Sequence, residues 1–340
     1  MNAILTGSDF LRAPILAAAQ PDGFKEWHHF VIHGRGHRIL INFSLTNETS
    51  ADGRARLAPR VIVIAHDDRW TGAIERFDTT ALDVSAGLGE LTIGENRMIV
   101  LSDGYRVLID LPDRDIRGEV EFASVSRPFV VNNQPIGEGR MNWLFVPRLR
   151  ADGWLRICGR EHRIEHELAY HDHNWGRFWW GDDFGWTWGT ILPSESDDPW
   201  SLVFLQMTDR RRLRYLSQAV YVWHRDEPAA IFRHAAVATR TLGVIARGAD
   251  CTLPAPMRLV LDGEVPGVPE CVEITATRAG DTVHAEFRSA SYARLAYPSE
   301  ISLDRCTVLC ETSGTARVTG NVNGERLDFV GAGVFEFLYG

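Results

Sequence analysis

Short runs of apolar and aromatic residues, each closed by a turn signal, recur along almost the whole chain of 340 residues. Segments such as Glu119–Val125 and Thr282–Phe287 have the length and composition of β-strands. Asp-Gly and Asn-Gly pairs, such as Asn323-Gly324, stand where hairpin turns are expected. Helical periodicity is weak, and the best helix candidate begins at Ser8 but soon meets a proline. The sequence therefore predicts an all-β protein of antiparallel strands with few helices.

Length and apolar content bound the architecture. Hydrophobic residues make up 45% of the chain, which is enough for a substantial core. The length favours two domains over one. We expect two antiparallel β-barrels in tandem, an N-terminal barrel over residues 1–168 and a C-terminal barrel over residues 169–340. No linker of distinctive composition separates them.

Charge and cysteine usage exclude several classes of partner. The net charge is −9 with both signs scattered, which argues against a nucleic-acid partner. Five cysteines without a CxxC motif indicate neither a zinc framework nor a disulfide scaffold, and they fit a cytoplasmic protein. No window is long and apolar enough to predict a transmembrane segment, while association with a membrane surface stays open. No nucleotide-binding motif and no nucleophile elbow is present in the sequence.

The densest cluster of reactive and aromatic residues is Tyr170-His171-Asp172-His173-Asn174-Trp175-Gly176, followed by an aromatic run that ends at Trp188. If residues 163–172 form a strand, Tyr170 and Asp172 share one face with Ile164 and Leu168. The opposite face is mostly charged, so we expect Tyr170 and Asp172 to point inward. Burial should raise the pKa of the Asp172 carboxyl and allow it to act as a general acid. The alternative is that Asp172 only caps a turn.

Histidine spacing raises the question of a metal ion. His162 and His166 are four residues apart, and four further histidines cluster near the N-terminus. On a strand, however, His166 and His171 would point to opposite faces, and no HExxH motif occurs. The sequence therefore predicts no metal site, although His28 or His29 could reach a pocket in the first barrel.

Three segments together resemble one family. They are Lys25-Glu26-Trp27-His28-His29-Phe30, the stretch from Asn142-Trp143-Leu144-Phe145-Val146-Pro147 to Tyr170-His171-Asp172-His173-Asn174-Trp175-Gly176, and the ending Gly331-Ala332-Gly333-Val334-Phe335-Glu336. In order and approximate spacing they resemble the hydroxyneurosporene synthase (carotenoid 1,2-hydratase) family of lipocalin-like proteins. The likeness spans most of the chain, and the Tyr-x-Asp-His-Asn-Trp-Gly element is its most specific part.

The resemblance implies two lipocalin-like barrels and a cofactor-independent enzyme that hydrates a double bond of a hydrophobic polyene. Asp172 matches the proton donor of that family, Tyr170 its partner, and Trp143 a ring that could stabilise a cation. The family pattern has a histidine two residues before that tryptophan, where this chain has Met141, which puts hydration in doubt. The remaining residues expected to line the substrate are His173, Trp175, Trp186, Trp188 and Trp27.

Two other functions stay open beside hydration. The same fold occurs in natural-product cyclases of the Diels–Alderase type, which need a shaped apolar cavity and few polar contacts. A protein that only binds a lipid or another hydrophobic ligand would also use a tryptophan-lined pocket. The sequence predicts a hydrophobic small-molecule partner and leaves the substrate and the oligomeric state open.

Overall fold

The computed structural model describes residues 4–17, 22–49, 55–180, 183–245, 267–300 and 306–339. The chain divides into two compact units, Met1–Phe178 and Trp179–Gly340. Residue 168, where the sequence analysis placed the boundary, lies inside a continuous strand, β12 (Arg160–Arg177). Both units are built from antiparallel strands, so the predicted all-β class is confirmed.

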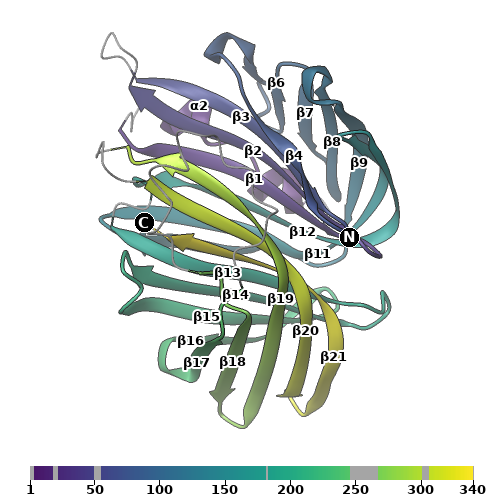
Figure 1. The fold of residues 1–340 in the computed structure, drawn as a ribbon, viewed down its shortest axis with the longest axis vertical. Helices are drawn as coiled ribbons and strands as arrows, with labels where there is room; N and C mark the ends of the chain where they lie inside the picture. Colours follow the sequence, from purple (N-terminus) through teal and green to yellow (C-terminus); the bar gives the residue numbers. More distant parts are fainter. Residues whose placement is uncertain are drawn as a thin grey trace. The chain divides into compact units, whose positions relative to one another are not determined.

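The first unit is one twelve-stranded sheet in the order β4-β3-β2-β1-β12-β11-β9-β8-β7-β6-β5, with β10 paired to β11 (Figure 1). Besides β12, its strands are β1 (Phe24–His33), β2 (Arg38–Thr49), β3 (Ala55–His66), β4 (Trp70–Arg76), β5 (Leu82–Val84), β6 (Glu90–Ile93), β7 (Asn96–Val100), β8 (Gly104–Leu111), β9 (Ile116–Ser124), β10 (Phe129–Ile136) and β11 (Gly139–Ile157). Of two short 3₁₀ turns, η1 (Thr79–Ala81) connects β4 to β5, at the two ends of the strand order, and η2 (Pro112–Arg114) connects the neighbouring strands β8 and β9.

Two short helices, α1 (Ile4–Ser8) and α2 (Ala13–Leu16), precede the sheet. The single helix expected to start at Ser8 is therefore wrong, because Ser8 ends the first helix. Pro14 lies in the first turn of the second helix, where a missing N–H removes no helical hydrogen bond. Leu5 and Leu11 of this N-terminal segment are buried in the core of the sheet.

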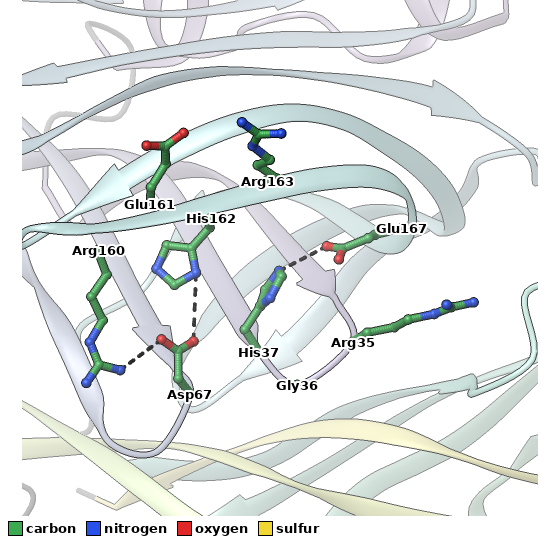
Figure 2. Close-up of a pocket in the computed structure, with 9 residues that line it drawn as sticks. All are labelled: Arg35, Gly36, His37, Asp67, Arg160, Glu161, His162, Arg163 and Glu167. Carbon is green, nitrogen blue, oxygen red and sulfur yellow. Dashed lines mark hydrogen bonds and ion pairs between the residues drawn. The ribbon is translucent and has the colours of Figure 1, made fainter.

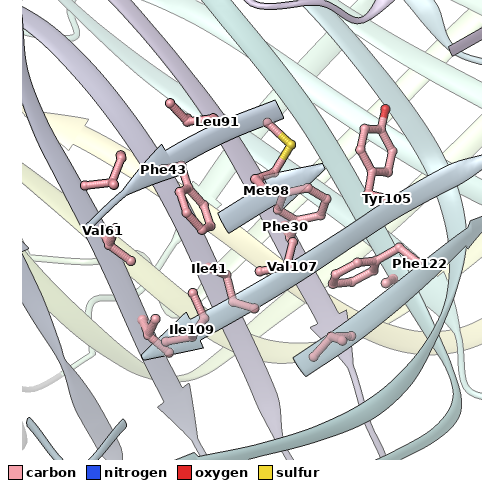
Figure 3. Close-up of a cluster of buried hydrophobic side chains, with 14 of the residues drawn as sticks. Phe30, Ile41, Phe43, Val61, Leu91, Met98, Tyr105, Val107, Ile109 and Phe122 are labelled. Carbon is pink, nitrogen blue, oxygen red and sulfur yellow. The ribbon is translucent and has the colours of Figure 1, made fainter. Parts of the chain in front are cut away.

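The core of the first unit lies on one face of the curved sheet. It joins residues from strands near both ends of the strand order, such as Val61 on β3 and Leu91 on β6, so the sheet wraps around it. Figure 3 shows part of this cluster, in which Phe30, Tyr105 and Phe122 pack ring against ring. The Phe30 and Phe122 ring centroids are 4.8 Å apart.

The alternation of β12 reverses within the strand. Ile164 belongs to the core cluster and has an even number, but the next core residue of the strand is the odd-numbered Ala169. Between them His166 has φ 54°, and its backbone N–H donates to the Asp152 carboxylate. Such a left-handed residue in a strand marks a bulge, which moves all later side chains to the other face.

The inward face predicted for β12 is consequently wrong after His166. His171, expected on a solvated face, is fully buried and points into the core of the first unit, where its ring stacks on Phe30 with centroids 4.2 Å apart. Tyr170 and Asp172 lie on the opposite face of the sheet, and both are nevertheless buried.

The second unit is a nine-stranded antiparallel sheet in the order β16-β15-β14-β13-β21-β20-β19-β18-β17. The strands are β13 (Phe184–Pro193), β14 (Trp200–Asp209), β15 (Tyr215–His224), β16 (Glu227–Arg233), β17 (Val237–Leu242), β18 (Cys271–Arg278), β19 (Asp281–Pro298), β20 (Cys306–Val322) and β21 (Glu325–Tyr339), with the 3₁₀ turn η3 (His234–Ala236) before β17. Its own core contains stacked Phe287 and Phe335, whose ring centroids are 4.2 Å apart.

Within the described ranges, no helix has the length and apolar character needed to cross a membrane. Of the five cysteines, Cys251 lies outside the described residues, and the four described cysteines are free thiols.

Candidate active site

Asp172 is the centre of a hydrogen-bonded triplet on one face of β12. The Tyr170 hydroxyl donates to Oδ2 of Asp172 at 2.9 Å, and the Asn174 amide donates to Oδ1 at 2.6 Å. The three side chains share a face because they are two residues apart on a strand. All are buried, and Asp172 is only 5% exposed. Both oxygens of this carboxyl group are therefore held in fixed positions.

Apolar and aromatic side chains of β11 form a row beside this triplet. In the strand register Phe145 lies opposite Asp172, and Trp143 lies opposite Asn174. The Trp143 and Phe145 rings stack with centroids 4.3 Å apart. Met141 continues the row on the same face and is 4% exposed. The carboxyl group thus borders an apolar wall of the kind that lines hydrophobic ligand sites.

On the other side of β12, strand β1 places an imidazole next to the acid. His29 lies opposite Asp172 in the register, and Trp27 lies opposite Asn174. Burial lowers the pKa of His29 to about 3, with a smaller contribution from the neighbouring His171, so its ring is neutral. The chain has Met141 where the resembling family has a histidine, but His29 supplies an imidazole beside the same carboxyl from a different strand.

Two residues expected to line the substrate lie on the opposite face of β12. His173 and Trp175 point into the core of the first unit, where their ring centroids are 4.8 Å apart. His173 bonds there to Asp9 and Glu26, and the Arg12 guanidinium lies over the Trp175 ring. The structure therefore does not bring these two side chains together with Asp172. The expectation that they line the same surface is corrected, because residues at odd and even positions point to opposite faces.

The other two expected tryptophans belong to the second unit. Trp186 and Trp188 lie on one face of β13 and are buried. The Trp186 indole N–H donates to Oε1 of Glu336 on β21, and Trp188 lies opposite Glu336 in the register. Glu311 of β20 is the next cross-strand neighbour and hydrogen bonds to Glu336.

Glu311 and Glu336 thus form a buried carboxyl pair. Burial raises the pKa of Glu336 to about 7, and the hydrogen bonds from Glu311 and Trp186 only partly oppose that rise. Two neighbouring carboxyl groups in such a setting share one proton near neutral pH. Sequence reasoning missed this pair, although each glutamate interrupts an apolar stretch, at Leu309-Cys310-Glu311 and Val334-Phe335-Glu336.

A separate polar hollow of about 540 Å³ lies at the start of β12, and Asp172 is not among its lining residues (Figure 2). His37 pairs there with Glu167, and Arg160 with Asp67. Three arginines and three carboxylates balance one another around it, so the hollow has no net charge to select an ionic ligand. Its lining is Arg35, Gly36, His37, Asp67, Arg160, Glu161, His162, Arg163 and Glu167.

Comparison of sequences identifies no relative for this chain. No family model matches it, and no curated protein matches it. The structure, in contrast, matches several solved structures over nearly its whole length.

An AttH-type protein of Nitrosomonas europaea matches with a TM-score of 0.61 at 14% identity, over 93% of this chain and 92% of that chain. CghA in complex with Sch210972 matches with a TM-score of 0.61 at 12% identity, over 94% of this chain and 89% of that chain. Kievitone hydratase of Nectria haematococca matches with a TM-score of 0.57 at 13% identity, over 100% and 96%. The chain therefore has the tandem lipocalin-like all-β fold of these proteins, as its sequence resemblance predicted.

Proposed function

We propose that the face around Asp172 is the active site of a cofactor-independent enzyme that adds water to a carbon–carbon double bond of a hydrophobic, isoprenoid-like substrate. The observation that carries the proposal is the buried Tyr170–Asp172–Asn174 triplet beside a row of aromatic rings. A hydratase among the proteins that share the fold supports the same reaction class.

In the proposed first step Asp172 transfers its proton to one alkene carbon, which leaves a carbocation on the neighbouring carbon and a carboxylate on the protein. The amide of Asn174 and the hydroxyl of Tyr170 both donate to that carboxylate. Hydrogen bonds to charge that develops in the transition state lower the barrier. Because a phenol hydroxyl donates and accepts, Tyr170 can pair with Asp172 before and after the transfer.

The aromatic row has a role in the second half of the reaction. The faces of Trp143 and Phe145 stabilise a cation that forms beside them, through the attraction of a positive charge to a ring. Water then attacks the cation and forms the carbon–oxygen bond. The neutral His29 ring, opposite Asp172 in the sheet, accepts the proton that water releases, and passing it back to the carboxylate restores the acid.

A direct test is a panel of acyclic isoprenoid hydrocarbons incubated with the protein in ¹⁸O-labelled water and analysed by mass spectrometry. The wild-type chain should incorporate one labelled oxygen into at least one substrate. Asp172→Asn keeps the size of the side chain but has no acidic proton, so we expect turnover to fall by roughly 10²-fold or more. The matched control is Asp110→Asn, which changes an exposed aspartate of β8. Full turnover in Asp172→Asn would exclude the acid role.

A cyclase is the second candidate, favoured by the aromatic row itself and by CghA among the proteins that share the fold. Such an enzyme works by holding a reactive conformer in a shaped apolar site. It would release an isomer of its substrate without labelled oxygen, and it would tolerate Asp172→Asn but not the loss of Trp143. Release of every ligand unchanged would instead indicate a binding protein.

A further inference from the structure

The core of the first unit contains a cluster of ionisable side chains that the proposed reaction does not use. Asp9 follows α1, Glu26 and His28 come from β1, and His171 and His173 come from β12. Each of the five is at most 1% exposed. Burying so many polar groups costs folding free energy unless each has a hydrogen-bond partner. The partners of each group therefore show which of them are satisfied.

His173 is fully paired. Its Nδ1 bonds to Oδ1 of Asp9 at 2.5 Å, and its Nε2 bonds to Oε1 of Glu26 at 2.7 Å. Burial alone would lower the pKa of His173, but the charges and hydrogen bonds of the two carboxylates raise it to about 9. Glu26 also accepts hydrogen bonds from the backbone N–H groups of Arg12 and Ala13, both at 2.6 Å. This half of the cluster is a satisfied ion-pair network.

His171 has a neighbour at each ring nitrogen, but its contact with Asp9 is longer than that of His173. Its Nδ1 lies 3.1 Å from the carbonyl oxygen of His29, and a carbonyl oxygen can only accept, so Nδ1 carries a proton. The other ring nitrogen, Nε2, points toward Asp9. That nitrogen lies 3.2 Å from Oδ2 of Asp9, which already accepts from the Tyr105 hydroxyl at 2.6 Å. An imidazole nitrogen and a carboxylate oxygen that face each other in this way form either an ion pair or two ligands of one cation.

His28 is the member of the cluster whose polar side-chain atoms lack hydrogen-bond partners among the described residues. Neither of its ring nitrogens has a hydrogen-bond partner within the described part of the chain, and the side chain is fully buried. Its ring stacks on His173 with centroids 3.8 Å apart and lies parallel to His171 at 5.5 Å. A buried neutral imidazole always has one donor and one acceptor to satisfy, so packing alone does not explain why a histidine stands here.

We propose that Asp9, His28 and His171 bind a divalent transition-metal ion, with Zn²⁺ as the best fit. One ligand atom from each residue can be chosen so that all three lie within 4.8 Å of one another. Ligands at the usual Zn–N and Zn–O distances sit roughly 3.3 Å apart on the edge of a tetrahedron, which matches the 3.2 Å between Nε2 of His171 and Oδ2 of Asp9. Two imidazoles and one carboxylate suit zinc, whereas Ca²⁺ and Mg²⁺ prefer oxygen ligands alone.

The surroundings of the three ligands support this assignment. The His29 carbonyl fixes the His171 ring so that Nε2 faces inward, which is the usual arrangement for a metal-binding histidine. Tyr105 and His173 hydrogen bond to the two oxygens of Asp9. Glu26, His28 and His173 form an alternative triplet, but His173 already uses both nitrogens on carboxylates.

The sequence argument against a metal site considered His166 and His171 as joint ligands. In the structure His166 is exposed and His171 is buried, so the two do not share a metal site. The proposed ligands instead come from positions 9, 28 and 171, which only the sheet brings together. The ion would have a structural role, since it lies within the core and joins the N-terminal segment to β1 and β12.

The test uses the full chain without a metal-binding purification tag. The protein is treated with a chelator, dialysed, mixed with Zn²⁺ alone and desalted, and the zinc bound per chain is measured by inductively coupled plasma mass spectrometry. The proposal expects about one zinc ion per wild-type chain, together with a rise in the thermal unfolding temperature. A folded wild-type chain that retains no zinc would overturn it without reference to any variant.

Variants assign the ligands. His28→Phe preserves the ring stack on His173 but removes both nitrogens, and it should lose the bound zinc. The matched control is His284→Phe, which changes an exposed histidine of β19 in the second unit and should leave the zinc content unchanged. Circular dichroism confirms that each variant is folded. If His28→Phe retains as much zinc as His284→Phe, His28 is not a ligand and the proposed site is wrong.

Discussion

The carboxyl pair of the second unit makes the stability of the protein depend on pH in a calculable direction. Burial raises the pKa of Glu336 from 4.5 to about 7, so the folded chain holds its proton more tightly than the unfolded chain. The stabilisation is fully present below the unfolded pKa and is lost as the pH rises through about 7. At about 1.4 kcal/mol per pKa unit the loss amounts to roughly 3 kcal/mol. Because Glu336 is partly exposed, this value is an upper bound.

The perturbation is Glu336→Gln, which keeps an acceptor for the Trp186 indole and an amide donor toward Glu311 but cannot titrate. The assay is urea unfolding at about pH 5 and about pH 7.5, with linear extrapolation of the unfolding free energy to water. About 1.8 of the 2.5 pKa units are titrated between these two conditions, so the wild-type chain should lose up to roughly 2.4 kcal/mol, and Glu336→Gln should lose distinctly less. Glu195→Gln, at an exposed position of the second unit, is the control and should behave as wild type. Equal losses in wild type and Glu336→Gln would refute the shared-proton reasoning.

Two further predictions concern packing and hydrogen bonding. Tyr105→Phe removes the hydroxyl that donates to the buried Asp9 carboxylate and should destabilise the first unit by about 1–3 kcal/mol in urea unfolding; an unchanged midpoint would show that this bond contributes nothing. Gly189→Ala would place a methyl group 2.6 Å from the ring of Phe335, and crowding a packed core in this way should cost about 1–3 kcal/mol. If Gly189→Ala had the same thermal unfolding temperature as the wild-type chain, the predicted crowding at Phe335 would be contradicted.

Local patterns in the sequence predicted the strands and placed Tyr170 and Asp172 on one face of a strand, because both depend on neighbours within that strand. The pairing of the two side chains was implied only by the family resemblance. The face of β12 could not be read from alternation alone. His166 has a left-handed backbone conformation that shifts the register of β12, and the side-chain pattern does not predict this conformation. After His166, therefore, Ala169 and His171, which were predicted to face solvent, point into the core.

Clusters that join distant positions were beyond sequence reasoning for a different reason. Asp9 meets His171 and His173 only because the segment after α1 packs into the core that β12 borders. Glu311 meets Glu336 through the register of two long strands. In each case the residue types are common in proteins. Their unusual hydrogen bonds and pKa values come from neighbours that are distant in the sequence.

The pairing of β1 with β12 also affects how the protein can be made in the cell. Lys25 lies opposite Gly176, so the ribosome must synthesise every other strand of the first unit before this seam can form. Until then Glu26 lacks its hydrogen bond to His173, and two strand edges remain open to neighbouring chains. Contacts this distant along the chain form slowly, and their exposed edges invite aggregation during synthesis. Assistance from a chaperone would matter most during that interval, before the last strand of the unit has emerged.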